Sequence, residues 1–257
     1  MITVKHVYDY LEKIAPFATQ IRGDNSGFLV GDLQTKVFRI LVCLDATNKV
    51  VAEAADKKAE LIISHHPLMY RGIEQLFKGE PVFDLVQNGI NLIAAHTNLD
   101  VADGGITDLM LTKLGFPPSD DVVGATTKGD TEFGKITVLD KAISAKELAQ
   151  KCKVAFDCTS VRYVDGGKLV KKIGVCSGGG GKYVELAFKK GCDAYVCGDL
   201  RNDRLVFADN VGLTLVDAGH FHTENIFCDD MVIKLQKAFP ELSVAKAENS
   251  VDLCDYV

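Results

Sequence analysis

Short apolar runs alternate with amphipathic segments along nearly the whole chain. The first half contains apolar runs typical of strands at 37–45, 60–64 and 90–95, with helical periodicity at 50–59, 81–89 and 106–115. The last two of these helices are expected to end at Gly89 and Gly115, because glycine readily adopts the left-handed conformation that closes a helix. The β-α-β-α-β-α order favours a mostly parallel sheet with helices on both faces and right-handed crossovers.

The alternation lapses between Gly115 and Phe133, where two prolines and many polar residues indicate a loop-rich boundary. A second strand–helix series follows it, and the chain closes with an amphipathic helix near 224–239 and a short strand. We therefore predict an α/β protein with two lobes built on mostly parallel, mixed sheets. The N-terminal lobe is expected to comprise residues 1–120, completed by 213–257, and the second lobe residues 130–212.

Composition narrows the possible partners. The net charge is −6 and the basic residues form no cluster, which argues against a nucleic-acid partner. The chain has no 18-residue apolar run and opens with an amphipathic helix pattern, which predicts a cytoplasmic protein that binds no membrane. Eight cysteines without a CxxC pair, mostly inside apolar runs, are expected to be buried thiols.

Five of the six histidines are confined to three short stretches, each directly after an apolar strand. These stretches are "SHHP" (64–67), "AHTNLD" (95–100) and "GHFHTE" (219–224). A lone histidine at such a position usually caps a strand or helix. Here each stretch also carries a carboxylate or a second imidazole, and the carboxyl ends of strands form ligand crevices in open α/β sheets. The constellation therefore predicts a metal site that brings N-terminal and C-terminal motifs together.

Spacing suggests how these side chains are directed. His96 and Asp100 are four residues apart, as are His220 and Glu224, so each pair can point to one side. His65 and His66 are adjacent and, in an extended strand end, would point in opposite directions, each toward a different ion.

The donor set combines imidazoles and carboxylates without thiolates. It suits two divalent transition-metal ions (Zn, Fe, Mn, Co or Ni) better than a structural thiolate site or an all-oxygen Ca or Mg site. The small number of donors leaves positions for water, which is typical of a catalytic centre.

These motifs, together with "DNSGFLVGD" (24–32), "VCSGGGG" and "DAYVCGD", resemble the dinuclear metal centre hexameric family, the NGG-interacting-factor-like proteins. Some of its members carry the name GTP cyclohydrolase type 2 homologue. The resemblance implies a toroidal homo-hexamer and metal ligands at His65, His66, Asp100, His220 and Glu224. The chain departs from the family pattern at Gly23, where a tryptophan is usual, and at Asn202 and Asp203, where many members have a histidine.

Three functions remain open. A dinuclear metal-dependent hydrolase would use His96 for proton transfer or to orient Asp100, with a nucleotide (by the resemblance) or a phosphoester as the small-molecule substrate. Alternatively, the chain is a metal-storage, metal-delivery or regulatory scaffold without turnover, or a protein-interaction module. The "SGGGG" stretch (177–181) is either a phosphate-binding turn or a tight turn required by close packing.

Overall fold

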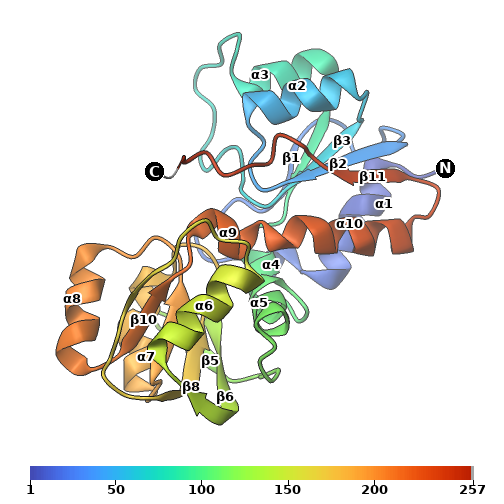
Figure 1. Ribbon diagram of the computed structural model, residues 1–257. Coiled ribbons are helices and arrows are strands. Elements are labelled where there is room, and N and C mark those ends of the chain that lie inside the picture. Colours follow the sequence, from blue (N-terminus) through green and yellow to red (C-terminus); the bar gives the residue numbers. More distant parts are fainter. Residues whose placement is uncertain (256–257) are drawn as a thin grey trace. The chain divides into compact units, whose positions relative to one another are not determined.

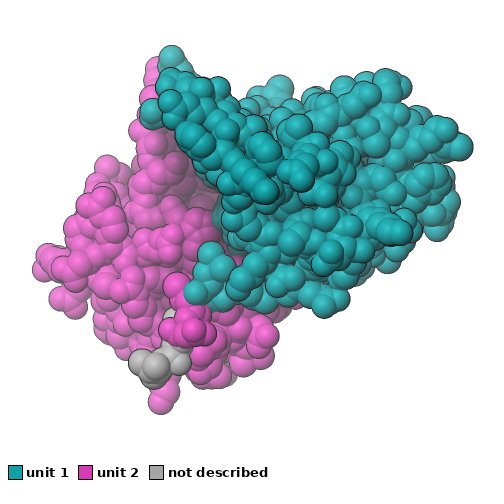
Figure 2. Space-filling model, turned by 90° about the horizontal axis from the view of Figure 1, so that it is seen from above, with its two compact units in different colours: residues 1–102, 227–253 teal, residues 103–226, 254–257 magenta. Residues whose placement is uncertain are grey.

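The computed structural model describes residues 1–255 and divides into two compact units (Figures 1 and 2). Unit 1 comprises residues 1–102 and 227–253, and unit 2 comprises residues 103–226 with Cys254 and Asp255. Each unit is built on one mixed β-sheet, which confirms the predicted α/β class. Within the described residues, none of the helices is both long and apolar enough to cross a membrane.

Unit 1 contains a five-stranded sheet in the order β1-β4-β3-β2-β11. Its strands are β1 (Gly27–Val30), β2 (Arg39–Cys43), β3 (Leu61–Ser64), β4 (Asn91–Ala94) and β11 (Ser243–Lys246). Four of them are parallel, and β1 joins the edge antiparallel to β4. All four residues of β3 and of β4 are buried, as expected for strands covered on both faces.

Helices cover both faces of this sheet, as the element order predicted: α2 and α3 lie on one face, and α1 and α10 on the other (Figure 1). The helices of this unit are α1 (Val4–Ile14), α2 (Asn48–Asp56), α3 (Pro81–Asn88), the short α4 (Thr97–Val101) and α10 (Ile226–Ala238). Local sequence explains their bounds. The Thr47 hydroxyl accepts the Val50 amide at the start of α2. Pro81 stands in the first turn of α3, which ends at left-handed Gly89.

Unit 2 contains a six-stranded sheet in the order β5-β6-β8-β9-β10-β7. Its strands are β5 (Val122–Gly124), β6 (Phe133–Ile143), β7 (Arg162–Val164), β8 (Val170–Val175), β9 (Ala194–Cys197) and β10 (Thr214–Asp217). The central strands β8, β9 and β10 are parallel; β6 and β7 pair antiparallel to β8 and β10, and β5 pairs antiparallel to β6. Its helices are α5 (Ile106–Leu114), α6 (Ala145–Ala155), α7 (Val184–Lys189), α8 (Asn202–Val211) and α9 (His220–Glu224).

The division of the chain differs from the predicted lobes at two places. Residues 213–226 were assigned to the N-terminal lobe, but they belong to unit 2, because β10 pairs with β9 and β7. Residues 103–120, with α5, also belong to unit 2. The segment 115–133, predicted as a loop-rich boundary, contains the short strand β5.

The cysteines lie where the apolar runs placed them. Seven of the eight are buried, and Cys254 is exposed. Burial raises the pKa of Cys192 to about 11, so this thiol stays protonated at neutral pH.

Candidate metal centre

His65 is fixed at the carboxyl end of β3, where the chain leaves the sheet. Its side chain is completely buried. The ring Nδ1 lies 2.7 Å from the carbonyl oxygen of Ala95, directly after β4. Because a carbonyl oxygen only accepts hydrogen bonds, Nδ1 donates, and a neutral ring then carries its electron pair on Nε2.

His66 is oriented by a carboxylate that follows the neighbouring strand β2. Its Nδ1 lies 2.8 Å from Oδ1 of Asp45. The prediction that His65 and His66 point in opposite directions is wrong, since their ring centroids are only 5.1 Å apart. The alternation of a strand no longer applies here because β3 ends at Ser64, and the Ser64 hydroxyl donates to the carbonyl oxygen of His66 in a local turn.

His96 precedes the first turn of α4 and is held by Asp24. Its Nδ1 lies 2.8 Å from Oδ1 of Asp24, whose other oxygen accepts from the Thr97 hydroxyl and the Thr97 amide. Burial alone would raise the pKa of Asp24, but the hydrogen bonds from His96 and Thr97 outweigh it and hold that pKa well below its usual range. Asp24 is therefore ionised and acts as a hydrogen-bond acceptor. Asp24 is the first residue of the "DNSGFLVGD" stretch.

Three imidazoles and one buried carboxylate gather in unit 1. One nitrogen from each of His65, His66 and His96 lies within 4.8 Å of the others. Asp100, in α4, is 5% exposed, and its Oδ1 lies 3.8 Å from Nε2 of His65. The sequence favours His96 as a proton carrier or an orienting residue over a ligand, whereas this geometry makes it a candidate ligand as well.

The unit 2 residues come from the single turn of α9. The Nε2 atom of His220 lies 2.9 Å from Oε2 of Glu224, so the four-residue spacing does direct both groups to one side. Its Nδ1 lies 2.6 Å from Oδ2 of Asp199, which follows β9. Burial by itself lowers the pKa of His220, but hydrogen bonding and charge from Glu224 and Asp199 raise it to about 9.

The glycine-rich turn lies directly against this pair. Gly178 has a φ of +54°, and a side chain on it would place Cβ only 1.9 Å from Oε1 of Glu224. Its amide donates to the Thr223 hydroxyl at 3.0 Å. Close packing against the His220–Glu224 pair therefore explains this glycine without a phosphate.

All four of these imidazoles share one arrangement: Nδ1 is bonded to an oxygen atom. Metal-binding histidines are typically held in this way, because the outer acceptor fixes the ring and directs Nε2 toward the metal. Within the described residues, the groups that could hold an ion consist of histidines and carboxylates and include no cysteine. This nitrogen–oxygen donor set fits a transition-metal ion.

Sequence reasoning missed the orienting carboxylates Asp24, Asp45 and Asp199. Two of them had a usable signal, because Asp45 and Asp199 closely follow β2 and β9, as the histidines follow β3, β4 and β10. Asp24 does not follow a strand, so only its place in the "DNSGFLVGD" motif could have marked it.

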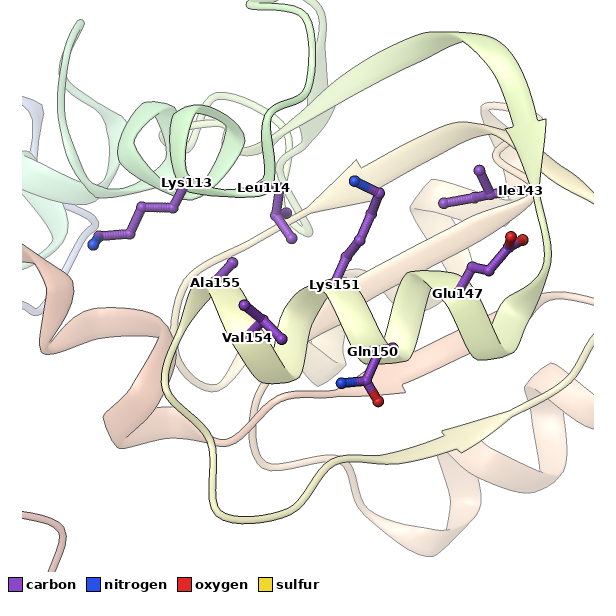
Figure 3. A pocket seen from close by; sticks show the side chains of 8 residues that line it. All are labelled: Lys113, Leu114, Ile143, Glu147, Gln150, Lys151, Val154 and Ala155. Atoms are coloured by element: carbon purple, nitrogen blue, oxygen red, sulfur yellow. The ribbon is translucent and has the colours of Figure 1, made fainter.

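A surface pocket of about 410 Å³ lies elsewhere in unit 2, between the end of α5 and α6 (Figure 3). Leu114, Ile143 and Val154 contribute apolar walls, and Lys151 points toward the space between Leu114 and Ile143. None of the predicted site residues lines it.

The two sheets and the histidine–carboxylate groups at their strand ends define an α/β protein with possible metal-binding sites. The DUF34/NIF3 (NGG1p interacting factor 3) family matches residues 2–252, so the chain belongs to this family. It is 30% identical to a Clostridium acetobutylicum protein named "GTP cyclohydrolase 1 type 2 homolog", over 98% of this chain and 97% of the relative.

Solved structures share the whole fold. The Staphylococcus aureus protein SA1388 superposes with a TM-score of 0.89 at 26% identity and covers 99% of both chains. Reduced HcgD from Methanocaldococcus jannaschii gives a TM-score of 0.83 at 26% identity, over 96% of this chain and 98% of that one.

Proposed function

We propose that this protein is a metal-dependent hydrolase whose ligands for two divalent transition-metal ions are His65, His66, Asp100, His220 and Glu224. The observation that carries the proposal is the shared arrangement of the imidazoles, each with Nδ1 bonded to a carbonyl or carboxylate oxygen. A histidine that merely caps a strand does not need an outer acceptor of this kind. Zn, Fe, Mn, Co and Ni all suit the donor set.

Other residues of the chain would orient the ligands and transfer a proton. Asp45 and Asp199 would keep His66 and His220 in the orientation that presents Nε2. Bound ions of this class supply Lewis acidity and lower the pKa of a coordinated water. His96, held by the ionised Asp24, would move the proton at its Nε2 between substrate and water.

The proposed substrate is a nucleotide, as the names of the curated relatives suggest, and a phosphoester is the chemical alternative. The test begins with elemental analysis of protein purified without added metal. An assay panel of nucleotides and phosphoesters follows, with His96→Asn as the inactive reference. Bound metal with turnover that His96→Asn abolishes supports the proposal.

The same experiment separates the alternative functions. Stoichiometric metal without turnover on the panel would instead favour a metal-storage, metal-delivery or regulatory scaffold. Protein that binds no transition metal at all would refute both functions.

We also propose that the protein is cytoplasmic and, as the family resemblance implies, that it forms a homo-hexamer. Light scattering coupled to size-exclusion chromatography should then give six chain masses. A monomer at micromolar concentration would contradict it.

A further inference from the structure

The carboxylate of Asp217 ties together two loops at the carboxyl end of the unit 2 sheet. Asp217 is the last residue of β10 and is 8% exposed. Its Oδ2 accepts the Leu200 amide at 3.1 Å, and its Oδ1 accepts the Gly219 amide at 3.2 Å. One side chain thus anchors the backbone that follows β9 and the backbone that follows β10.

Arg162, in the neighbouring strand β7, completes this anchor. Its Nε and Nη2 lie 2.9 and 2.8 Å from Oδ2 of Asp217, and Nη2 also donates to the carbonyl oxygen of Leu200. Both backbone polar groups of Leu200 are therefore held by one Arg–Asp pair. Bonds of this type are charge-assisted and stronger than those between neutral groups.

The two anchored residues are the direct neighbours of the pair at the candidate metal centre. Leu200 follows Asp199, and Gly219 precedes His220. The side chains of Asp199 and His220 are hydrogen-bonded to each other at 2.6 Å. Asp199 has a φ of +53°, a backbone conformation that side-chain-bearing residues rarely adopt and that persists only where the surroundings impose it.

The two loops also touch directly through their backbones. A Cβ on Gly198 would lie 2.5 Å from the backbone nitrogen of His220, so this contact leaves no room for a side chain. Within this close contact, a small movement of either loop would separate Asp199 from His220.

We infer that the Arg162–Asp217 pair positions Asp199 against Nδ1 of His220 and so sets the orientation in which His220 would bind a metal. The consequence for metal binding rests on the proposed function. The hydrogen bonds of Arg162 and Asp217 join them to each other and to the backbone of Leu200 and Gly219, so both side chains act through the backbone. The competing explanation is that the pair merely stabilises the sheet.

Unit 2 offers a matched control for that explanation. Asp193 precedes β9, at the opposite end of the parallel strands, and its Oδ2 accepts the amides of Lys171 and Lys172 at 3.0 and 2.9 Å. Its Oδ1 lies 3.4 Å from the Lys168 ammonium. Asp193→Asn thus removes a similar carboxylate that accepts two backbone amides and pairs with a cation, but far from His220.

The experiment compares Asp217→Asn, Arg162→Gln and Asp193→Asn in the full-length protein. The first readout is the imidazole 1H–15N NMR spectrum of the metal-free protein, in which the Nδ1 proton of His220 reports its bond to Asp199. The second is Zn²⁺ affinity by chelator competition. Asp217→Asn should shift or broaden the His220 signal. It should also weaken the affinity of the Zn²⁺ ion that His220 would bind by roughly 10-fold or more.

Arg162→Gln keeps both amide acceptors of Asp217 and should act in the same direction with a smaller change. It also tests the inference should Asp217→Asn fail to fold. Asp193→Asn should lower thermal stability but leave the His220 signal in place.

A wild-type His220 signal in a folded Asp217→Asn or Arg162→Gln protein would overturn the inference, as would an equal shift in Asp193→Asn. Because the NMR readout needs no metal, a wild-type protein that binds no transition metal would refute the proposed function and leave the positioning role testable.

Discussion

The candidate metal ligands of unit 1 and unit 2 are prepared in different ways. Unit 1 presents three imidazoles and the buried Asp100, and its His65 is oriented by a backbone carbonyl group. Unit 2 presents one imidazole, His220, and one carboxylate, Glu224, which are already hydrogen-bonded to each other. The His220 side chain is 35% exposed.

The two units also differ in whether a metal ion must displace a proton from an imidazole before it can bind. The raised pKa of His220 keeps its ring protonated at neutral pH in the metal-free protein, so metal binding there must release a proton. We therefore expect the unit 1 residues to account for more of the metal affinity and the unit 2 residues for more of its pH dependence.

The largest expected effect is the loss of a unit 1 imidazole. His66→Ala should remove at least one ion per chain, because a lost ligand costs more than the roughly 10–100-fold that loss of an outer carboxylate costs. His220→Ala should cost less affinity. Elemental analysis and chelator competition measure both.

His6→Gln is the matched control for these variants. His6 lies outside the candidate site, in the capping box of α1, and glutamine can keep that box. An equal loss of metal from His66→Ala and His220→Ala would break the comparison between the units.

His96→Asn separates proton transfer from metal binding within unit 1. As a proton carrier, His96 should be worth roughly 10²–10⁴ in rate, with the metal content unchanged. Turnover on the responsive substrate and metal content should be measured on the same sample. Loss of metal from this variant would instead make His96 a ligand, as its nitrogen within 4.8 Å of those of His65 and His66 allows.

The sequence predicted most of the fold because most elements have strong apolar periodicity. The buried runs of β2, β3, β4 and β10 and the glycines that end α3 and α5 were all legible. Strand β1 was missed because its residues are buried at the ends and only partly buried between them, a pattern without alternation. Its position depends on antiparallel pairing with β4, a contact between distant segments.

The same reason limits what the sequence could show about the site. The candidate residues were found because histidines are rare in this chain and cluster after strands. The directions of their side chains could not be predicted, because the turn at Ser64 and the partners Asp24, Asp45 and Asp199 depend on tertiary structure. Whether the five predicted ligands bind metal remains a prediction.

Glu224→Gln tests the protonation difference between the units. In the metal-free wild type, the His220 pKa should be near 9, and removal of the Glu224 charge should lower it toward its ordinary value of about 6.5. NMR titration of the His220 ring measures this.

The sign of the linked stability follows from the raised pKa. Any stability from this pair is fully present below about pH 6.5 and is lost as the pH rises through about 9. A His220 pKa that is the same in wild type and Glu224→Gln would contradict the hydrogen bond between them.

The smallest expected effect on the metal site comes from Glu53, which anchors the C-terminal segment of unit 1. Glu53 lies in α2, is buried, and accepts from the Lys57 ammonium and from the amides of Glu248 and Asn249. Burial alone would raise the pKa of Glu53, but these hydrogen bonds outweigh it and lower that pKa to about 2. Because none of the predicted ligands bonds to Glu53, Glu53→Gln should leave the metal content at pH 7 unchanged.

The same variant should nevertheless destabilise the fold by about 2–3 kcal/mol at pH 7, since the folded-state pKa of Glu53 is depressed from an ordinary value near 4.5. A group of this kind stabilises the protein above pH 4.5, and that contribution is lost as the pH falls toward 2. Urea unfolding should thus separate wild type from Glu53→Gln at pH 7 and bring them together near pH 2–3. Glu248→Gln, which removes only the exposed carboxylate paired with Lys57, should change stability by less than about 0.5 kcal/mol. If Glu53→Gln instead released metal at pH 7 without unfolding, the unit 1 residues would depend on the C-terminal segment and would not be independently prepared.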